Sequence, residues 1–289
     1  MPTIDILGVP HAYECTSSNE QTSAPVLVFL HGWLLSHHYW QPLIKQIAGK
    51  YQCLVYDLRG FGDTQIPGEA NSQGNCTRYY TLAAYAEDLH CLLQKLEIKK
   101  AWLIGHSLGG SVALWAADYN QNIIEGVICL NSGGGIYLKE EFERFRTVGK
   151  NLIKYRPSWL IYIPLIDFLF TRMMVDRPLN LRWGRQRIID FIRADKKAAL
   201  SSLLDSTTET EVHLLPRLVA SLPQPVYFIA GKKDRVMEPK YVNHLASFHQ
   251  LFAPHGNNVF EIPDCGHLSM LEQPEIVASI IINILKQHQ

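Results

Sequence analysis

The chain has 289 residues, of which 47% are hydrophobic and 19% are charged, with 27 basic and 27 acidic residues. This balance gives no global positive field, which argues against a nucleic-acid-binding function. The length and apolar content suffice for one large core, or for a core domain with an insertion.

The first residues, the longest apolar stretch and the cysteines indicate the cellular compartment of the protein. The first five residues lack the basic and apolar regions of a secretory signal peptide. The nearest candidate for a transmembrane segment, residues 159–175, is interrupted by Pro164, Asp167 and Arg172, so none is predicted. The six cysteines include no CxxC pair and no zinc-like spacing. We therefore expect reduced thiols in a cytoplasmic protein.

Short apolar runs rich in β-forming residues recur along the chain, each followed by turn residues. Residues 4–7 and 11–15 flank Gly8-Val9-Pro10 and predict a hairpin. Further strands are predicted at 26–30, 53–56, 101–104, 126–130, 226–230 and 259–262. The later runs are nearly continuous in apolar residues, as expected for strands buried on both faces of a parallel sheet.

Helical patterns separate these runs. Thr81 is a predicted N-cap, and apolar residues follow it at helical spacing as far as Leu96. Residues 107–119 predict a helix directly after a strand, and residues 276–285 carry the apolar stripe of a final helix. Such alternation of strands and helices predicts an α/β fold, a parallel sheet covered by helices on both faces.

One region breaks this alternation. No strand is evident from residue 132 to residue 222, where helical stretches are rich in aromatic and basic residues. The gap is too long for a loop between two strands. We predict a helical cap at 132–222 that covers the C-terminal edge of the sheet, and a core domain formed by 1–131 and 223–289.

Gly105-His106-Ser107-Leu108-Gly109 matches the pattern G-x-S-x-G between a predicted strand and a predicted helix. Glycines on either side of the serine let the strand and the helix approach closely. The hydroxyl is then presented at the sheet edge, beside a helix N-terminus that favours negative charge. We predict Ser107 as a nucleophile; the alternative is a glycine-rich turn with an incidental serine.

A serine nucleophile needs a base, and the base needs a carboxylate to orient it. His267 follows the last predicted strand and can reach over the sheet edge, and Asp234 follows the strand before it. The rival positions are weaker, because Asn131-Ser132-Gly133-Gly134 contains no carboxylate and Asp264 lies too close to His267 in sequence. We predict His267 as the base and Asp234 as the acid.

The third predicted strand leads into His31-Gly32-Trp33-Leu34. The glycine permits a tight turn that leaves backbone N–H groups free to bind a developing oxyanion. We predict the N–H groups of Leu108 and Trp33 as these donors, with Leu34 as the alternative to Trp33. The side chain of Trp33 either walls the acyl pocket or belongs to the core.

These motifs resemble those of the α/β-hydrolase family, which carries its catalytic residues in the order Ser107, Asp234, His267. Further matches are His31-Gly32, the loop at 57–62, and the Glu272 and Pro274 that follow the histidine. The resemblance implies an eight-stranded, mostly parallel sheet with helices on both faces and a helical cap after the sixth strand. Because Ser107 occupies the position of the nucleophile, the aspartate-dependent reactions of haloalkane dehalogenases and epoxide hydrolases are not expected.

The substrate contacts are predicted from the cap and the oxyanion loop. We expect Trp33, Leu34, Trp159 and Phe168 to bind a small-molecule substrate with an apolar acyl group. The alternative is that the cap aromatics pack the cap's own core. No cofactor is expected, and no metal either, since the pair His37-His38 has no evident third ligand.

The predicted function is cofactor-independent hydrolysis of carboxylic esters or related acyl compounds through an acyl-enzyme. Three alternatives share the fold: a carbon–carbon bond hydrolase, a lyase similar to that of the menaquinone pathway, and a small-molecule receptor. Ser111 stands where the lyases tend to carry arginine, and Trp33-Leu34-Leu35 stands where carbon–carbon hydrolases often have small residues. The sequence leaves the oligomeric state open.

Overall fold

The structure, a computed structural model, describes residues 1–16, 24–66, 80–133, 139–253 and 256–289. Its strands form one eight-stranded sheet in the order β1-β2-β4-β3-β5-β6-β7-β8. The strands are β1 (Thr3–Ile6), β2 (Val9–Cys15), β3 (Val26–Leu30), β4 (Cys53–Tyr56), β5 (Ala101–His106), β6 (Ile124–Leu130), β7 (Val226–Gly231) and β8 (Val259–Ile262).

The sheet is mostly parallel. β1 and β2 form an antiparallel hairpin, β2 pairs antiparallel with β4, and every pair from β4 to β8 is parallel. In β3, Val28 and Leu30 pack into one hydrophobic cluster, whereas Leu27 and Phe29 pack into another. This alternation is why the run is apolar at every position, since both faces of the strand are buried.

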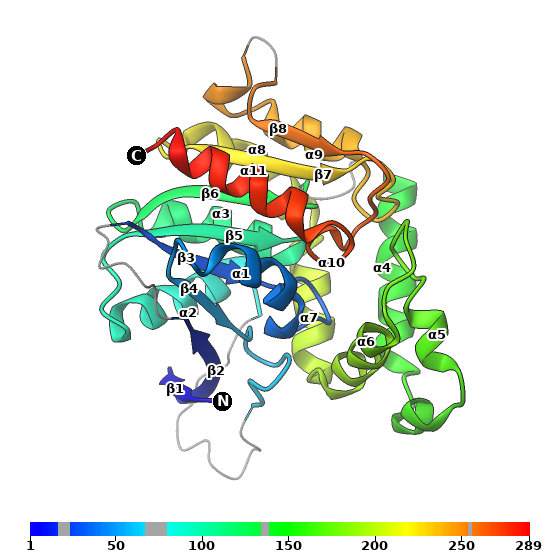
Figure 1. The fold of residues 1–289 in the computed structure, drawn as a ribbon. Coiled ribbons are helices and arrows are strands. Elements are labelled where there is room, and N and C mark those ends of the chain that lie inside the picture. The colour runs from blue at the N-terminus through cyan, green and yellow to red at the C-terminus, as the bar shows by residue number, and fades with distance from the viewer. Residues whose placement is uncertain (17–23, 67–79, 134–138, 254–255) are drawn as a thin grey trace.

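Helices cover both faces of the sheet (Figure 1). One layer contains α2 (Leu82–Lys95), α3 (Leu108–Tyr119), α8 (Glu209–Ser221) and α9 (Pro239–Ala246). The other contains α1 (Gln41–Ile47), α10 (Ser269–Glu272) and α11 (Pro274–Lys286). Two short 3-10 helices, η1 (His37–Trp40) and η4 (Gln250–Phe252), lie in the connections. The predicted α/β fold with helices on both faces is confirmed.

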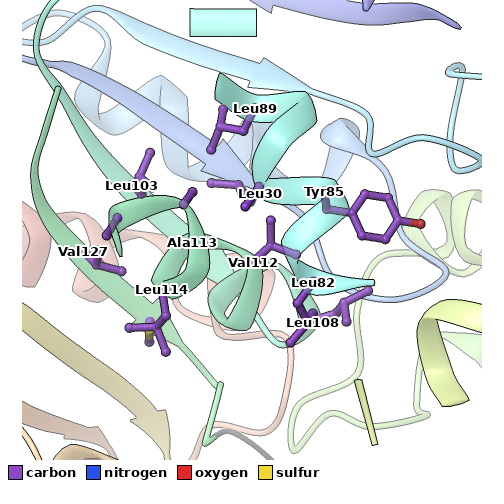
Figure 2. Close-up of a cluster of buried hydrophobic side chains, with 14 of the residues drawn as sticks. Leu30, Leu82, Tyr85, Leu89, Leu103, Leu108, Val112, Ala113, Leu114 and Val127 are labelled. Atoms are coloured by element: carbon purple, nitrogen blue, oxygen red, sulfur yellow. The ribbon is translucent and has the colours of Figure 1, made fainter. Parts of the chain in front are cut away.

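Figure 2 shows how the first layer packs. Leu30, Leu103 and Val127, from neighbouring strands, point toward Val112 of α3 and Leu89 of α2. The N-terminus of α2 is fixed by the predicted cap, because the Thr81 hydroxyl accepts a hydrogen bond of 3.1 Å from the N–H of Ala84. Burial of these branched side chains contributes about 1.5–3 kcal/mol each and anchors α3, the helix that follows Ser107.

The predicted strands match those observed, with small shifts at their ends. β3, β4 and β8 have the predicted limits, while β5 continues two residues further, to His106, and β6 begins two residues earlier, at Ile124. The longer β5 brings His106 into the sheet directly before the nucleophile turn. The two residues added to β5, Gly105 and His106, carry no apolar signal, so the sequence pattern stopped at Ile104.

Between β6 and β7 the described chain is helical. It forms α4 (Lys139–Lys154), η3 (Ser158–Tyr162), α5 (Ile166–Phe170), α6 (Leu181–Arg193), α7 (Lys196–Ser206) and α8. In Figure 1, α4, α5 and α6 lie beyond one end of the sheet, whereas α8 lies alongside it. Leu215, Leu218 and Val219 of α8 pack in the same cluster as Val226 of β7. We therefore propose that the cap ends near Thr207, earlier than the predicted limit at 222.

No helix in the described part of the chain combines the length and the apolar character that a membrane-spanning segment requires.

Candidate active site

Ser107 lies at the sharp turn between β5 and α3. Its backbone has φ 51° and ψ −118°, a conformation that a non-glycine residue rarely adopts and that stores of the order of 1–3 kcal/mol of strain. The residues two positions before and two positions after it must be glycine. A Cβ at Gly105 would lie 2.3 Å from the carbonyl oxygen of Gly109, and a Cβ at Gly109 would lie 2.3 Å from the carbonyl oxygen of Leu30. The turn thus presents the Ser107 side chain at the C-terminal end of β5.

His267 and Asp234 are hydrogen-bonded to each other. His267 Nδ1 donates to Asp234 Oδ2 across 2.7 Å, and both side chains are almost fully buried. The other carboxylate oxygen accepts from the N–H groups of Val236 at 2.8 Å and Met237 at 2.9 Å. Burial alone raises the pKa of Asp234, but the neighbouring His267 and these hydrogen bonds outweigh it, so the pKa of Asp234 is lowered. The carboxylate therefore stays ionised and holds Nδ1 as the donor.

Asn131 is a buried part of this arrangement that the sequence reasoning missed. Its Nδ2 donates to Asp234 Oδ2 at 3.0 Å and to the carbonyl oxygen of Gly266 at 3.1 Å. Its Oδ1 accepts a hydrogen bond of 2.5 Å from the hydroxyl of Ser269. Its position directly after β6 marks it as a residue of the sheet edge, but an asparagine is not a carboxylate and so does not match the acid of a triad. Asn131 joins the acid to the loop that carries the base.

Asp264, the rival for the acid, lies elsewhere. Its side chain is exposed and forms an ion pair of 2.9 Å with Lys233. That ion pair lowers the pKa of Asp264. The structure therefore brings Asp234, and not Asp264, to His267.

His106, directly before the nucleophile, lies close to the base. It lines the same cavity, and its ring centroid is 4.8 Å from that of His267. Its Nε2 donates to the carbonyl oxygen of His267 at 2.8 Å. Burial, together with the adjacent His267, lowers the pKa of His106 to about 3, so the ring is neutral. His106 thus fixes the backbone of the base without adding charge.

The N–H groups expected to bind an oxyanion are those of Leu108 and of Trp33 or Leu34. Within the described residues, none of these three N–H groups donates a hydrogen bond to another backbone group. Leu34 has a positive φ of 58°, which marks the tight turn after β3. The Trp33 indole donates to the carbonyl oxygen of Ala199 at 2.8 Å and so ties this loop to α7.

The loop at Asp57 is hydrogen-bonded to the 3-10 helix η1. Asp57 is fully buried and accepts hydrogen bonds from the backbone N–H of His37 at 2.6 Å and from its Nδ1 at 2.9 Å. The structure also corrects the view that the histidine pair lacks a third metal ligand, because atoms of His37, His38 and Asp63 lie within 4.8 Å of one another. Asp63 already pairs with Arg193 at 3.1 Å, and we assign this cluster no part in the chemistry.

Ser107 and His267 both line one cavity of about 490 Å³ between the sheet and the cap. No direct hydrogen bond joins the two side chains, both of which are described; in unliganded hydrolytic sites this contact is often loose. The cavity wall is largely aliphatic, aromatic and methionine side chains, and Arg187 is the one lining residue of permanent charge among those described. The volume falls within the usual range for small-molecule sites, about 300–1,000 Å³.

Of the four residues predicted to contact the substrate, Trp33 and Leu34 line the cavity, whereas the other two need correction. Trp159 and Phe168 are exposed and do not line the cavity. Their neighbours Leu160, Leu169 and Phe170 line it instead. Composition alone could not decide which side of η3 and α5 faces inward, because both sides are apolar.

Comparison with known proteins agrees with the fold. Residues 27–280 match the family described as the Alpha/beta hydrolase family. The chain is 26% identical to Protein PHYLLO of Arabidopsis thaliana over 94% of this chain, and the matched region is only 16% of that protein. It is also 26% identical to 3-oxoadipate enol-lactonase 1 of Acinetobacter baylyi, over 94% of this chain and 92% of the lactonase.

Among solved structures, a thermophilic esterase from Thermogutta terrifontis superposes with a TM-score of 0.73 and 24% identity, over 99% of this chain and 96% of the esterase. That identity supports the fold alone. The superposition and the family match over most of the sequence both agree with the α/β fold described above. The chain belongs to the alpha/beta hydrolase family and is a hydrolase.

Proposed function

We propose that the protein hydrolyses carboxylic esters or related acyl compounds, with Ser107 as nucleophile, His267 as base and Asp234 as the acid that orients the base. The observation that carries the proposal is the hydrogen bond of 2.7 Å between Asp234 and His267 Nδ1, in a cavity that Ser107 also lines. With Nδ1 donating its proton to the carboxylate, Nε2 carries the lone pair that a general base needs.

The proposed reaction has two steps, acylation and deacylation. His267 Nε2 takes the proton of Ser107 as Oγ attacks the carbonyl carbon of the ester. The same proton passes to the leaving alkoxide as the carbon–oxygen bond breaks, which leaves an acyl-Ser107. Water attacks this acyl-enzyme with His267 again as base, and the proton passes to Ser107 Oγ as its bond to the acyl carbon breaks and the carboxylic acid leaves. No cofactor enters any of these steps.

The oxyanion of each tetrahedral intermediate is proposed to bind to the N–H of Leu108 and to that of Trp33, with Leu34 as the alternative. Leu108 begins α3, so its N–H lies at the positive end of that helix dipole. Donors already oriented toward the developing charge lose little energy in reorganisation, and each contributes about 10²–10³ in rate.

The substrate class is inferred from the cavity wall. Phe145, Leu152, Phe170 and Phe191 give it an apolar lining, which favours an acyl group of several carbons over acetate. The lactonase reported above has a name that denotes acyl chemistry, which supports the same class for this chain.

The test is reaction with a fluorophosphonate probe, followed by pre-steady-state hydrolysis of a p-nitrophenyl ester. We expect one label per chain, located at Ser107, and a burst of p-nitrophenol that equals the enzyme concentration. A labelled Ser107 without turnover of any ester would point to the lyase or to the receptor. A label on another residue would refute the assignment of the nucleophile.

A further inference from the structure

The outer side of the cap exposes large apolar side chains. Tyr162 and Leu165 are 81% and 85% exposed, and Trp159 is 61% exposed. We call this set the cap surface; its members are Tyr155, Trp159, Tyr162, Leu165, Phe168 and Leu169. All six lie within residues 155–169, on or beside η3 and α5. Large exposed apolar side chains that gather in one part of a protein usually mark a binding surface.

The fold keeps this surface turned outward. The inner side of η3 and α5 packs on α6, where Arg185 Nη1 donates to the carbonyl oxygen of Ile161 at 2.6 Å. In Figure 1, α5 lies at the outer edge of the cap, on the side away from the sheet. The packing on α6 therefore keeps most of the cap surface on the outer side, while Leu169 lies at its boundary with the cavity.

Basic residues are frequent in the stretch of chain that carries the cap surface. Residues 150–182 contain six Lys or Arg and two Asp or Glu, although the whole chain is balanced. The two acids are already paired, Asp167 with Arg185 at 3.7 Å and Asp176 with Lys233 at 3.4 Å. Cations lie beside the exposed rings: Arg172 is 4.5 Å from the ring centroid of Phe168, and Lys154 is 5.0 Å from that of Tyr155.

The mouth of the catalytic cavity opens beside this patch. Val148, Leu152, Met173 and Met174 line the cavity and are also exposed to solvent. Leu169 belongs to both the cavity wall and the cap surface. An apolar acyl chain can therefore pass from the cap surface to the cavity along apolar side chains.

We propose that the cap surface docks on an anionic lipid membrane and that acyl substrates enter the cavity from it. Aromatic and aliphatic side chains flanked by Lys and Arg are the composition of interfacial anchors, whose cations bind anionic headgroups while the apolar groups enter the acyl boundary. A second copy of the chain is a poorer occupant, because a symmetric contact would bring the two basic rims together. The entry of substrate rests on the proposed function; the docking does not.

Docking is measured with full-length Ser107→Ala, so that turnover plays no part. Vesicles of phosphatidylcholine, with and without phosphatidylglycerol, are sedimented with the protein. We expect binding to the anionic vesicles and its loss at roughly 1 M salt, where the Debye length falls to about 3 Å. Lys154→Glu with Arg172→Glu should weaken binding at least about 25-fold, because each basic residue near an anionic surface contributes roughly fivefold.

The apolar contribution is tested with Tyr162→Ser and Leu165→Asn together. Both side chains face solvent, and asparagine suits the left-handed backbone at position 165, where φ is 62°, so the fold should persist. We expect binding to fall about tenfold or more. The matched controls are Phe248→Ser and Ile276→Ser, which change exposed apolar residues on the surface of the core domain. Lys50→Glu, also on the core domain, is the control for charge. These should bind as the parent does.

Substrate entry is tested with Ser107 intact. The Tyr162→Ser, Leu165→Asn variant should hydrolyse soluble p-nitrophenyl acetate at the parent rate but lose activity on a long-chain ester carried in anionic vesicles. Three outcomes would each overturn the docking proposal. The first is that the protein does not bind vesicles. The second is that the control substitutions weaken binding as much as the cap substitutions do, and the third is that the cap substitutions alone dissociate a dimer. Vesicle binding without any esterase activity would refute the proposed function and leave the docking intact.

Discussion

The backbone N–H of His267 donates a hydrogen bond of 2.8 Å to the carbonyl oxygen of Met174, which joins the base to the segment between α5 and α6. The same segment is held from the other side by Arg187, whose Nη1 donates to the carbonyl oxygens of Phe170 at 2.5 Å and Met173 at 2.7 Å. The position of the base therefore depends on the cap as well as on the sheet.

Glu272 is predicted to position the base through this junction. Its carboxylate accepts from the N–H groups of Gly266 at 3.1 Å and Leu268 at 3.3 Å, on either side of His267, and from that of Asp176 at 2.8 Å. Glu272→Gln exchanges charge-assisted bonds, about 1.5–3 kcal/mol each, for neutral ones of about 0.5–1.5 kcal/mol. We expect kcat to fall about tenfold and Tm to fall by several degrees, with KM little changed.

The matched control is Glu275→Gln, in the first turn of α11. It makes the same chemical change one turn away, without a contact to the histidine loop, and should leave kcat as in the parent. Equal losses in the two variants would assign Glu272 a general structural role.

Ser107→Ala should abolish turnover. A nucleophile that acts as a unit with its base contributes about 10⁶ in kcat, and the residual rate should be that of the oxyanion donors and binding alone. Steady-state kinetics on p-nitrophenyl hexanoate measure the loss. Ser111→Ala is the control, since Ser111 lines the same cavity and should stay within tenfold of the parent. Wild-type rates for Ser107→Ala would show that another group carries the reaction.

Asp234→Asn should lower kcat by about 10⁴ with the fold intact, because the amide favours the wrong tautomer of His267. Asp264→Asn makes the same exchange at the exposed acid paired with Lys233, and should have little effect. Circular dichroism checks the fold of both. A larger loss in Asp264→Asn than in Asp234→Asn would move the acid to position 264.

The sequence predicted the sheet well because its strands are buried on both faces and therefore read as unbroken apolar runs. It predicted the positions of Ser107, Asp234 and His267 because each follows such a run, where parallel strands bring side chains to one edge. Asn131 was missed because its role depends on hydrogen bonds to Asp234 and Gly266 that only the folded chain brings together.

In the cap the sequence failed at a finer level. Trp159 and Phe168 were chosen by size and aromaticity, yet Leu160 and Phe170 are the residues that face the cavity. Helices with apolar residues on two sides give no periodic signal that distinguishes the inner side from the outer one. The role of Glu272 was hidden for a different reason, because its partners are backbone groups, which carry no sequence signature.

Asp190 should make stability fall as the pH rises. Burial raises the pKa of this carboxyl to about 7 from its ordinary value of 3.8, despite hydrogen bonds from Ser36 and Gln186. Between about pH 4 and pH 7 the unfolded chain loses this proton while the native state keeps it, so the free energy of unfolding falls with rising pH and levels off above about pH 7. The fall is about 4 kcal/mol, from 1.36 kcal/mol per pKa unit.

Urea unfolding of the parent and of Asp190→Asn across this range measures the effect. The asparagine keeps an acceptor and cannot ionise, so its unfolding free energy should be flatter with pH and higher than the parent's at pH above about 7. Parallel profiles for the two proteins would contradict the prediction.

The last prediction concerns the acyl cavity. Its wall is apolar, so kcat/KM should rise along a series of p-nitrophenyl esters from acetyl to hexanoyl. Each buried methylene contributes about 0.8 kcal/mol, which over four methylenes is about 3 kcal/mol, or roughly a hundredfold. Phe170→Ala should flatten the series, because Phe170 lines the cavity, where it packs with Phe191 at a centroid distance of 6.3 Å. Phe168→Ala, two residues away and exposed, should leave the series unchanged. A flat series in the parent would mean that the acyl chain does not enter this cavity. Equal effects of the two substitutions would mean that Phe170 acts through the stability of the cap and not through contact with the substrate.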